Sequence, residues 1–556
     1  MRSLSPFFRL FLLFILLSFG HIVSAAPVGF NVAGLYKLNS SLPFSDLFKL
    51  SQGWYTSCDY NWQAKQAIDP GCTSNNSFNT KEQGWLDIDA DGWVRSLPLR
   101  NERPIFTSVV SSINLPAHFP LGRYVVLYEG EGKVQVEGGV AIRNEKSGRI
   151  EFDLTTLKKG LKIYIKATNP RNYIKNIHLV AAKNERSFRN NFFNPNYVNK
   201  VRPFTAIRFM PWQNSKETAL VNWSERPKIS EAHYNGNKGV PIEVMVDLAN
   251  QTNAAPWFSI PYKANQDFVR NFARLVKQRL RGGKKVYVEY SNEVWNSLYP
   301  VHHMASRLAM TRWSNKHQDK GGLRKQYLLA NWYGEKSVDT CNIWKQEFGG
   351  QSGRVICVIA SFARNPEVGR ETLACPLSKH APCGKKVEAY AVAPYFGDNV
   401  ARIENRAQVK QWAHSGAAGL DKLFKELSQG GVLKGGPAGG SIQLAYEEGM
   451  KGSAAIAKEF GVQLVAYEAG QHLKRDDPPH TVRDPAVKEL FLQANLDPRM
   501  GNLYGQYFNQ WKRAGGGLLL HFYGIAESEP NTAFGMLENV NSNSSPKYNA
   551  LMNFLR

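Results

Sequence analysis

Two stretches of the chain decide the fold: residues 285–293 (KVYVEYSNE) and residues 462–468 (VQLVAYE). Each is a short, mostly apolar run that ends on a glutamate, as expected of a buried strand with a carboxylate at its end. Asn292 stands directly before Glu293, and Ala-Gly-Gln follows Glu468. We therefore expect two buried strands whose ends each carry one carboxylate.

Six further segments have the same apolar character, and helical patterns lie between most of them. Parallel strands that are covered by helices read as near-continuous apolar runs of this kind. Eight of them predict an α/β fold, a (β/α)8 TIM barrel, in which functional residues gather at the C-terminal ends of the strands. The expected strands are 29–35, 205–210, 256–261, 285–293, 354–362, 388–395, 462–468 and 517–523.

The long interval between the first two expected strands has a different pattern. Within residues 85–186, short runs alternate between apolar and polar residues and are separated by Gly, Asn and charged residues. This pattern predicts an antiparallel β-sandwich, inserted between barrel strands 1 and 2. We thus divide the chain into residues 26–84 (first strand and loop), 85–186 (the sandwich) and 187–556 (the rest of the barrel). The sandwich either binds carbohydrate or walls the cleft, and the sequence favours neither.

The N-terminus has the features of a secretory signal peptide over residues 1–25. Arg2 and Arg9 accompany an apolar run over 11–19, and small residues follow at 23–25. The apolar run is short for a membrane span, and no later stretch is long and apolar enough to be one. We expect cleavage near Ala25, export to the periplasm or the medium, and no transmembrane segment.

The chain is strongly basic, with 69 Lys and Arg against 46 Asp and Glu, a formal net charge of +23. Such a charge attracts anionic partners, here an acidic polysaccharide or an anionic cell surface. A broadly basic surface without a dedicated site explains the same composition, because the charges are spread along the chain. No nucleic-acid-binding motif is present, so nucleic acid is not an expected partner.

Six cysteines in an exported chain suggest disulfides. Cys58 with Cys72, and Cys375 with Cys383, are the simplest local pairs. The state of Cys341 and Cys357 stays open, and a buried free thiol is one alternative for Cys357, which lies within an apolar run. The spacing fits no zinc site.

The segment Asp87-x-Asp89-x-Asp91-Gly92 matches the start of a calcium-binding loop. Pro98 occupies the position where such a loop carries its last carboxylate. A polar hairpin turn explains the same residues. Calcium is therefore a weak candidate, and no other metal and no organic cofactor is expected.

Glu293 and Glu468 should both reach the mouth of the barrel. We expect Glu289 and Glu293 to share one side of strand four, with Glu289 deeper among the barrel layers, and Leu464, Ala466 and Glu468 to share one side of strand seven. Two carboxylates at the ends of two buried strands suit retaining glycoside hydrolysis, in which one protonates the leaving oxygen and the other attacks the anomeric carbon. Either carboxylate alone has a structural explanation, as a helix N-terminal charge or an ion-pair partner.

The Asn-Glu pair that ends strand four and the glutamate that ends strand seven resemble glycoside hydrolase clan A. The segment 286–296 (VYVEYSNEVWN) also resembles bacterial exported proteins that are often labelled cellulose-binding. The resemblance implies that Glu293 is the acid/base and Glu468 the nucleophile. It further implies that Asn292 binds the substrate 2-hydroxyl, Arg208 keeps Glu468 ionised and Tyr395 hydrogen-bonds Glu468.

Aromatic and polar residues near the expected strand ends are candidates for sugar contacts, although packing is the commoner role of any one of them. The chain departs from clan A in two places: strand eight ends His-Phe-Tyr-Gly where the clan commonly has Trp, and Pro261-Tyr262 stands where it often has His. The candidates are Trp212, Trp257, Trp295, Gln471, His472, His521 and Tyr523.

The sequence thus predicts a secreted, retaining glycoside hydrolase that acts on a polysaccharide or oligosaccharide. A non-catalytic, cellulose-binding-like exported protein on the same barrel is the alternative. A polyanion-binding adhesin is a third possibility, and its binding would weaken strongly with salt.

Overall fold

A computed structural model gives the structure of the chain. It describes residues 27–35, 40–61, 63–68, 72, 78–79, 86–97, 108–113, 115–215, 217–314, 323–474, 484–528 and 533–556. The expected signal peptide and its cleavage site lie outside the described residues. No helix in the described part of the chain is long and apolar enough to cross a membrane.

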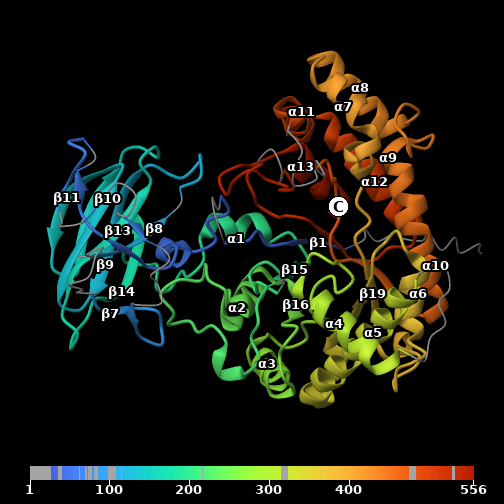
Figure 1. Cartoon of the computed structure of the whole chain (residues 1–556), viewed down its shortest axis with the longest axis horizontal. Coiled ribbons are helices and arrows are strands. Elements are labelled where there is room, and N and C mark those ends of the chain that lie inside the picture. Colours follow the sequence, from blue (N-terminus) through green and yellow to red (C-terminus); the bar gives the residue numbers. More distant parts are fainter. Residues whose placement is uncertain are drawn as a thin grey trace, which may run out of the picture.

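Eight parallel strands form a closed barrel, which confirms the expected TIM-barrel fold (Figure 1). Neighbours in the barrel are consecutive among these eight strands, and the last pairs with the first. Six of the strands lie within the apolar segments expected from the sequence, and β1 and β16 each begin one residue before theirs. The strands are β1 (Val28–Asn31), β15 (Ala206–Arg208), β16 (Ala255–Ile260), β17 (Val286–Tyr290), β18 (Val355–Ala360), β19 (Ala389–Val392), β20 (Gln463–Ala466) and β21 (Leu519–His521).

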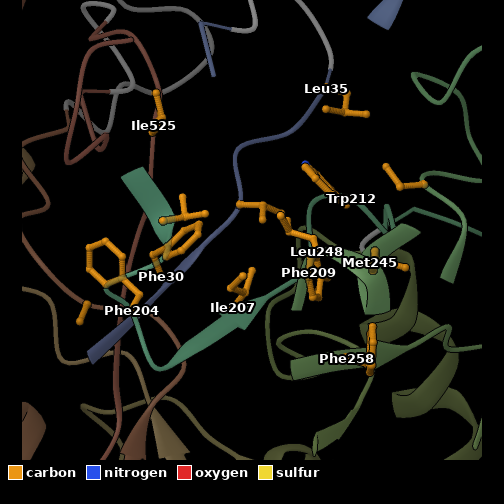
Figure 2. Close-up of a cluster of buried hydrophobic side chains, with 14 of the residues drawn as sticks. Phe30, Leu35, Phe204, Ile207, Phe209, Trp212, Met245, Leu248, Phe258 and Ile525 are labelled. Carbon is orange, nitrogen blue, oxygen red and sulfur yellow. The ribbon is translucent and has the colours of Figure 1, made fainter. Parts of the chain in front are cut away.

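Helices cover the outside of the barrel, as right-handed β-α-β connections require. A large apolar core lies between strands and helices, where aromatic rings such as Phe209 and Phe258 pack with centroids 5.7 Å apart (Figure 2). The helices are α1 (Pro195–Val201), α2 (Ile242–Thr252), α3 (Gln266–Arg279), α4 (Pro300–Trp313), α5 (Arg324–Phe348), α6 (Pro366–Ala374), α7 (Arg406–Ala413), α8 (Ala417–Gln429), α9 (Gly440–Leu444), α10 (Gly452–Phe460), α11 (Pro485–Leu496), α12 (Arg499–Arg513) and α13 (Pro546–Leu555).

A second, smaller cluster fills the interior of the barrel. It takes side chains from six of the strands or the residue beside them, including Val358 and Ala391, and several of its members are alanines. Small residues leave room inside the barrel for the few large side chains that point inward, among them Trp257 and Tyr467. These inward positions determine which polar side chains meet at the mouth.

Two antiparallel sheets between β1 and β15 form the expected sandwich, which lies beside the barrel (Figure 1). One sheet has the order β10-β13-β8-β2-β5 and the other β11-β12-β9-β14. The strands are β2 (Tyr55–Ser57), β5 (Phe78–Asn79), β8 (Ser108–Ile113), β9 (Gly122–Glu129), β10 (Gly132–Gly138), β11 (Val140–Lys146), β12 (Arg149–Leu154), β13 (Leu161–Thr168) and β14 (Lys175–Ala181).

The sandwich begins earlier in the chain than residue 85, because β2 and β5 belong to its first sheet. These two strands have three and two residues, too few for a period-two pattern to emerge from the sequence. Asp46 ties this part of the chain to the second sheet, since its carboxylate accepts the backbone N–H of Leu179 and lies 2.7 Å from Nδ1 of His178.

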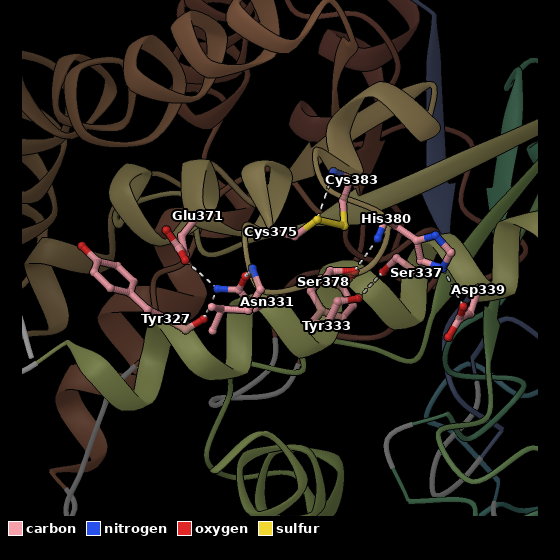
Figure 3. Close-up of a disulfide and its surroundings, with 11 residues drawn as sticks. Tyr327, Asn331, Tyr333, Ser337, Asp339, Glu371, Cys375, Ser378, His380 and Cys383 are labelled. Atoms are coloured by element: carbon pink, nitrogen blue, oxygen red, sulfur yellow. Dashed lines mark hydrogen bonds and ion pairs between the residues drawn. A yellow bond between two sulfur atoms is a disulfide. The ribbon is translucent and has the colours of Figure 1, made fainter. Parts of the chain in front are cut away.

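All six cysteines are paired. The bonds Cys58–Cys72 and Cys375–Cys383 are those expected from the sequence. The third bond joins Cys341 of α5 to Cys357 of β18, so Cys357 is not a free thiol. Figure 3 shows the Cys375–Cys383 bond beside α5, where Asn331 donates to the carboxylate of Glu371 at 2.5 Å.

Replacing both Cys341 and Cys357 by alanine is expected to lower the free energy of unfolding by about 3 kcal/mol, because the bond closes a loop of sequence separation 16 in the unfolded chain. Urea denaturation of the oxidised protein and the double variant measures the difference. An unchanged denaturation midpoint would contradict a stabilising role for this bond.

Candidate active site

The two glutamates lie just beyond the ends of their strands. β17 ends at Tyr290, and Ser291 and Glu293 have positive φ angles of 59° and 43°. Non-glycine residues rarely adopt this conformation, and such strain is concentrated at functional sites. The strand alternation expected up to Glu293 therefore stops at Tyr290, and a tight turn sets the direction of the Glu293 side chain.

The expected inward set on strand seven is wrong. Val465 and Tyr467 point into the barrel, whereas Leu464 and Ala466 pack in the outer core. The strand ends at Ala466, so Glu468 follows no strand alternation and reaches the mouth from the segment after it.

Arg208 lies at the centre of the site and is completely buried. Its guanidinium pairs with Glu289 at 2.9 Å and with Glu468 at 3.1 Å. It also donates to the amide oxygens of Asn292 at 2.8 Å and Asn31 at 3.1 Å. Burial lowers the pKa of Arg208, but the two carboxylates outweigh that effect and raise it above its ordinary value. The guanidinium of Arg208 thus forms ion pairs with two carboxylates, those of Glu289 and Glu468.

Glu289 lies below the mouth, and none of its surface is exposed. It therefore cannot take the place of Glu293 as the acid that meets a substrate. Besides Arg208, the indole N–H of Trp257 donates to its carboxylate at 2.9 Å and the hydroxyl of Ser259 at 3.3 Å. Complete burial raises the pKa of Glu289, and Arg208 opposes that shift. Its position among the barrel layers is the one expected from the sequence.

Glu468 is buried, at 6% exposure, and it contacts a guanidinium and a phenol hydroxyl. Arg208 holds Oε1, and the hydroxyl of Tyr395 donates to Oε2 at 2.9 Å. Burial, and then the charge of Glu468, raise the pKa of Tyr395 well above its ordinary value, so its hydroxyl stays protonated and donates. Both contacts stabilise negative charge on Glu468.

Glu293 is partly exposed, and its recorded partners are neutral donors. The hydroxyl of Tyr467 donates to Oε1 at 2.8 Å, and the side-chain amide of Asn296 to Oε2 at 2.9 Å. Burial, and then Glu293, raise the pKa of Tyr467 well above its ordinary value. Trp295 lies edge-on to the Tyr467 ring at 6.1 Å and adds apolar surface beside Glu293.

Two expected sugar contacts are structural instead. Trp257 is fully buried, stacks on Tyr287 and donates to Glu289, so it presents no surface to a ligand. His521 is also fully buried, between the hydroxyl of Tyr504 and the carbonyl of Tyr523, and burial lowers its pKa to about 3. Trp257 lies inside the barrel, whereas His521 faces outward and contacts Tyr504 of α12.

The remaining candidates lie on two sides of the site. Trp212 and Tyr523 line a cavity of about 340 Å³, although Trp212 is only 2% exposed. His472 lies 5.0 Å from the ring of Tyr395, and both line a cavity of about 120 Å³. Gln471 is buried and bonds the backbone of Leu473 and Ala533, which is a structural role.

The three calcium candidates, Asp87, Asp89 and Asp91, do not form a group with metal-ligand spacing. Asp87 pairs with Arg95, and Asp89 accepts the backbone N–H groups of Asp91 and Trp93 within the hairpin. These residues form the polar turn that the sequence left open as the alternative. In the described part of the chain, the one group with metal-ligand spacing is Cys341, Cys357 and Glu388, and its thiols form a disulfide.

Tyr467 is the residue that sequence reasoning missed. It donates to Glu293 and its ring lies 5.0 Å below the Arg208 guanidinium. The apolar run 462–468 allows two alternations of inward and outward residues. The one that places Val465 inward also places Tyr467 inward, and it was not the one chosen. Asn31, which ends the first strand, was missed for lack of any local motif.

No family model and no curated protein matches the chain. Solved structures that it resembles include a Bacteroidetes-affiliated GH5 cellulase (13% identity, 65% of this chain and 84% of the other, TM-score 0.35). The chain also resembles a xyloglucan-specific endo-beta-1,4-glucanase from a metagenomic library (12% identity, 67% of this chain and 91% of the other, TM-score 0.35). A third similar structure is a GH10 protein from Paenibacillus barcinonensis (12% identity, 65% of this chain and 91% of the other, TM-score 0.33). Matches of this strength do not specify an activity, so function must be argued from the site.

Replacing Arg208 by methionine is expected to lower the free energy of unfolding by about 3–5 kcal/mol, because it leaves Glu289 as an unpaired buried carboxylate. A raised pKa in the folded state means that the folded protein binds the proton more tightly, so the loss should be larger at pH 7 than at pH 5. Urea denaturation at both pH values measures it.

Adding Glu289→Gln to Arg208→Met should recover part of the loss, since the buried charge is then gone. The matched control is Arg274→Met, which breaks a surface pair with Glu347 and should cost less than about 1 kcal/mol. If the losses of unfolding free energy caused by Arg208→Met and Glu289→Gln simply add in the double variant, the two side chains are not energetically coupled.

Proposed function

We propose that the protein is a retaining glycoside hydrolase that acts on a polysaccharide or oligosaccharide. Glu293 is the general acid/base and Glu468 the nucleophile. The observation that carries the proposal is the difference between the two carboxylates. Glu468 is held by a buried guanidinium and a phenol, whereas the recorded partners of Glu293 are neutral donors. Unlike surroundings are what assign different roles to two acids in one site.

In the first step, the carboxylate of Glu468 attacks the anomeric carbon and the glycosidic C–O bond breaks. Glu293 gives its proton to the departing oxygen, so the leaving sugar departs as a neutral alcohol. Water then enters, Glu293 takes a proton from it, and the hydroxide adds to the anomeric carbon while the ester to Glu468 breaks. Two inversions return the original anomeric configuration.

The other residues of the site bind and orient. Arg208 and Tyr395 fix both oxygens of Glu468, so one oxygen faces the anomeric carbon without rotation. Asn292 gives its amide oxygen to Arg208, and its Nδ2 is a buried donor that has no partner among the described residues. A buried unpaired donor at a binding site calls for an acceptor, and a substrate 2-hydroxyl supplies one. The reaction needs no metal or organic cofactor.

The proposed location is the periplasm or the medium. Three disulfides fit an oxidising compartment, in line with the signal peptide expected over residues 1–25. The substrate is therefore an extracellular carbohydrate, and the sandwich is a candidate for holding it near the barrel.

Reducing-sugar release from a broad panel of polysaccharides tests the proposal. Glu293→Gln and Glu468→Gln are each expected to lower the rate by at least about 10²–10³-fold, because each removes an acid, base or nucleophile. The matched control is Glu459→Gln, a surface glutamate that pairs with Arg370, and it should match the wild type. NMR of the first product should show the anomeric configuration of the substrate.

Full activity in either active-site variant would refute the assignment of that residue, and an inverted product would refute the retaining mechanism. If no glycan is cleaved but glycans bind equally to wild type and both variants, the protein is the non-catalytic carbohydrate-binding alternative.

Tyr395→Phe is expected to lower kcat by about 10–100-fold with little change in KM, because a hydrogen bond to a charged group contributes about 1.5–3 kcal/mol. Tyr467→Phe removes the matching donor from Glu293 and should shift the pH profile of kcat more than Tyr395→Phe does. Steady-state kinetics across pH measures both. Identical profiles in the two variants would contradict the separate roles of the carboxylates.

A further inference from the structure

A large cavity lies beside the segment that follows Glu293 and has no part in the chemistry proposed above. It begins at Val294 and Trp295, the two residues that follow Glu293, and extends between α4, α5 and the segment after β18. Its volume is about 720 Å³, within the range of pockets that hold small ligands.

The lining combines rings with polar groups. Trp295, Tyr333 and Phe362 bring aromatic surface, and Phe362 is 52% exposed, which is unusual for so large an apolar side chain. The polar lining residues are His302, His303, Lys325, Gln326, Asn365 and three serines with Thr372. Among the described residues that line the cavity, none is a carboxylate.

The cavity is built into the fold. Asn331, beside the lining residue Ala330 on α5, donates to Glu371 of α6, and the Cys375–Cys383 bond closes the end of α6 (Figure 3). Phe362 also lines the small cavity of Tyr395 and His472, so the two cavities share a wall beside the active site.

We propose that this cavity binds the leaving-group side of the glycan and selects an anionic sugar, a uronate or a sulfated residue. The inference rests on the proposed function, because a general acid faces the departing oxygen and Val294 follows Glu293 directly. The aromatic faces stack on sugar rings, Lys325 binds the carboxylate or sulfate, and no lining carboxylate opposes it. The formal charge of +23 draws such a chain to the protein.

The test is calorimetric titration of the full-length mature protein carrying Glu468→Gln, which binds without turnover. The probes are hexasaccharides of alginate, polygalacturonate and chondroitin sulfate, with cellohexaose and mannohexaose as neutral counterparts. Lys325→Gln is expected to weaken binding of the preferred anionic hexasaccharide about tenfold and to leave neutral binding unchanged. Phe362→Ala should weaken both.

The matched control is Lys336→Gln, also on α5 but outside the cavity and paired with Asp339, and it should change nothing. The inference is overturned if no anionic hexasaccharide binds, if neutral ones bind as tightly, or if Lys325→Gln has no more effect than the control. Weakened anionic binding in Lys325→Gln, together with a wild type that cleaves nothing, would support the cavity's anion preference and reject hydrolysis, so the two failures are distinct.

Discussion

The ion pairs of Arg208 are the interaction on which the site depends. A guanidinium sealed inside a barrel is tolerated only with compensating charge, and here the compensation comes from strands on both sides of the barrel: Glu289 from β17 and Glu468 from beyond β20. The same group therefore neutralises the barrel interior and determines where Glu468 lies. Stability and chemistry meet in one side chain, so substitutions around it will seldom affect only one of them.

Much of the architecture could be predicted, because strands that are buried on both faces consist mainly of apolar residues. Each barrel strand is covered on both faces, so the eight apolar runs stood out, and both candidate acids follow such runs. The direction of individual side chains was harder to predict. Strands of three or four residues carry too little alternation to establish a register, and for this reason Tyr467 was missed and Leu464 was placed on the wrong face. Trp257 was misjudged because an indole that pairs with a buried acid looks, in sequence, like one that stacks on sugar.

The mouth of the barrel has unlike sides. Arg208 and Tyr395 contact Glu468, and the ring of Tyr395 packs against a cluster that includes Phe522 and Phe534. Val294 and Trp295, which follow Glu293, line the large cavity. Under the proposed mechanism, the leaving sugar departs on the side of the mouth that carries this cavity.

The closure of the barrel joins opposite ends of the chain. β1 pairs with β21, so Phe30 lies beside His521 in the sheet although almost the whole protein separates them in sequence. A contact of such long range forms late, since its loop entropy must be overcome by structure that already exists. The first barrel strand to be synthesised therefore gains its second neighbour only when β21 is in place. A chain truncated before residue 519 would lack a partner for that edge of β1.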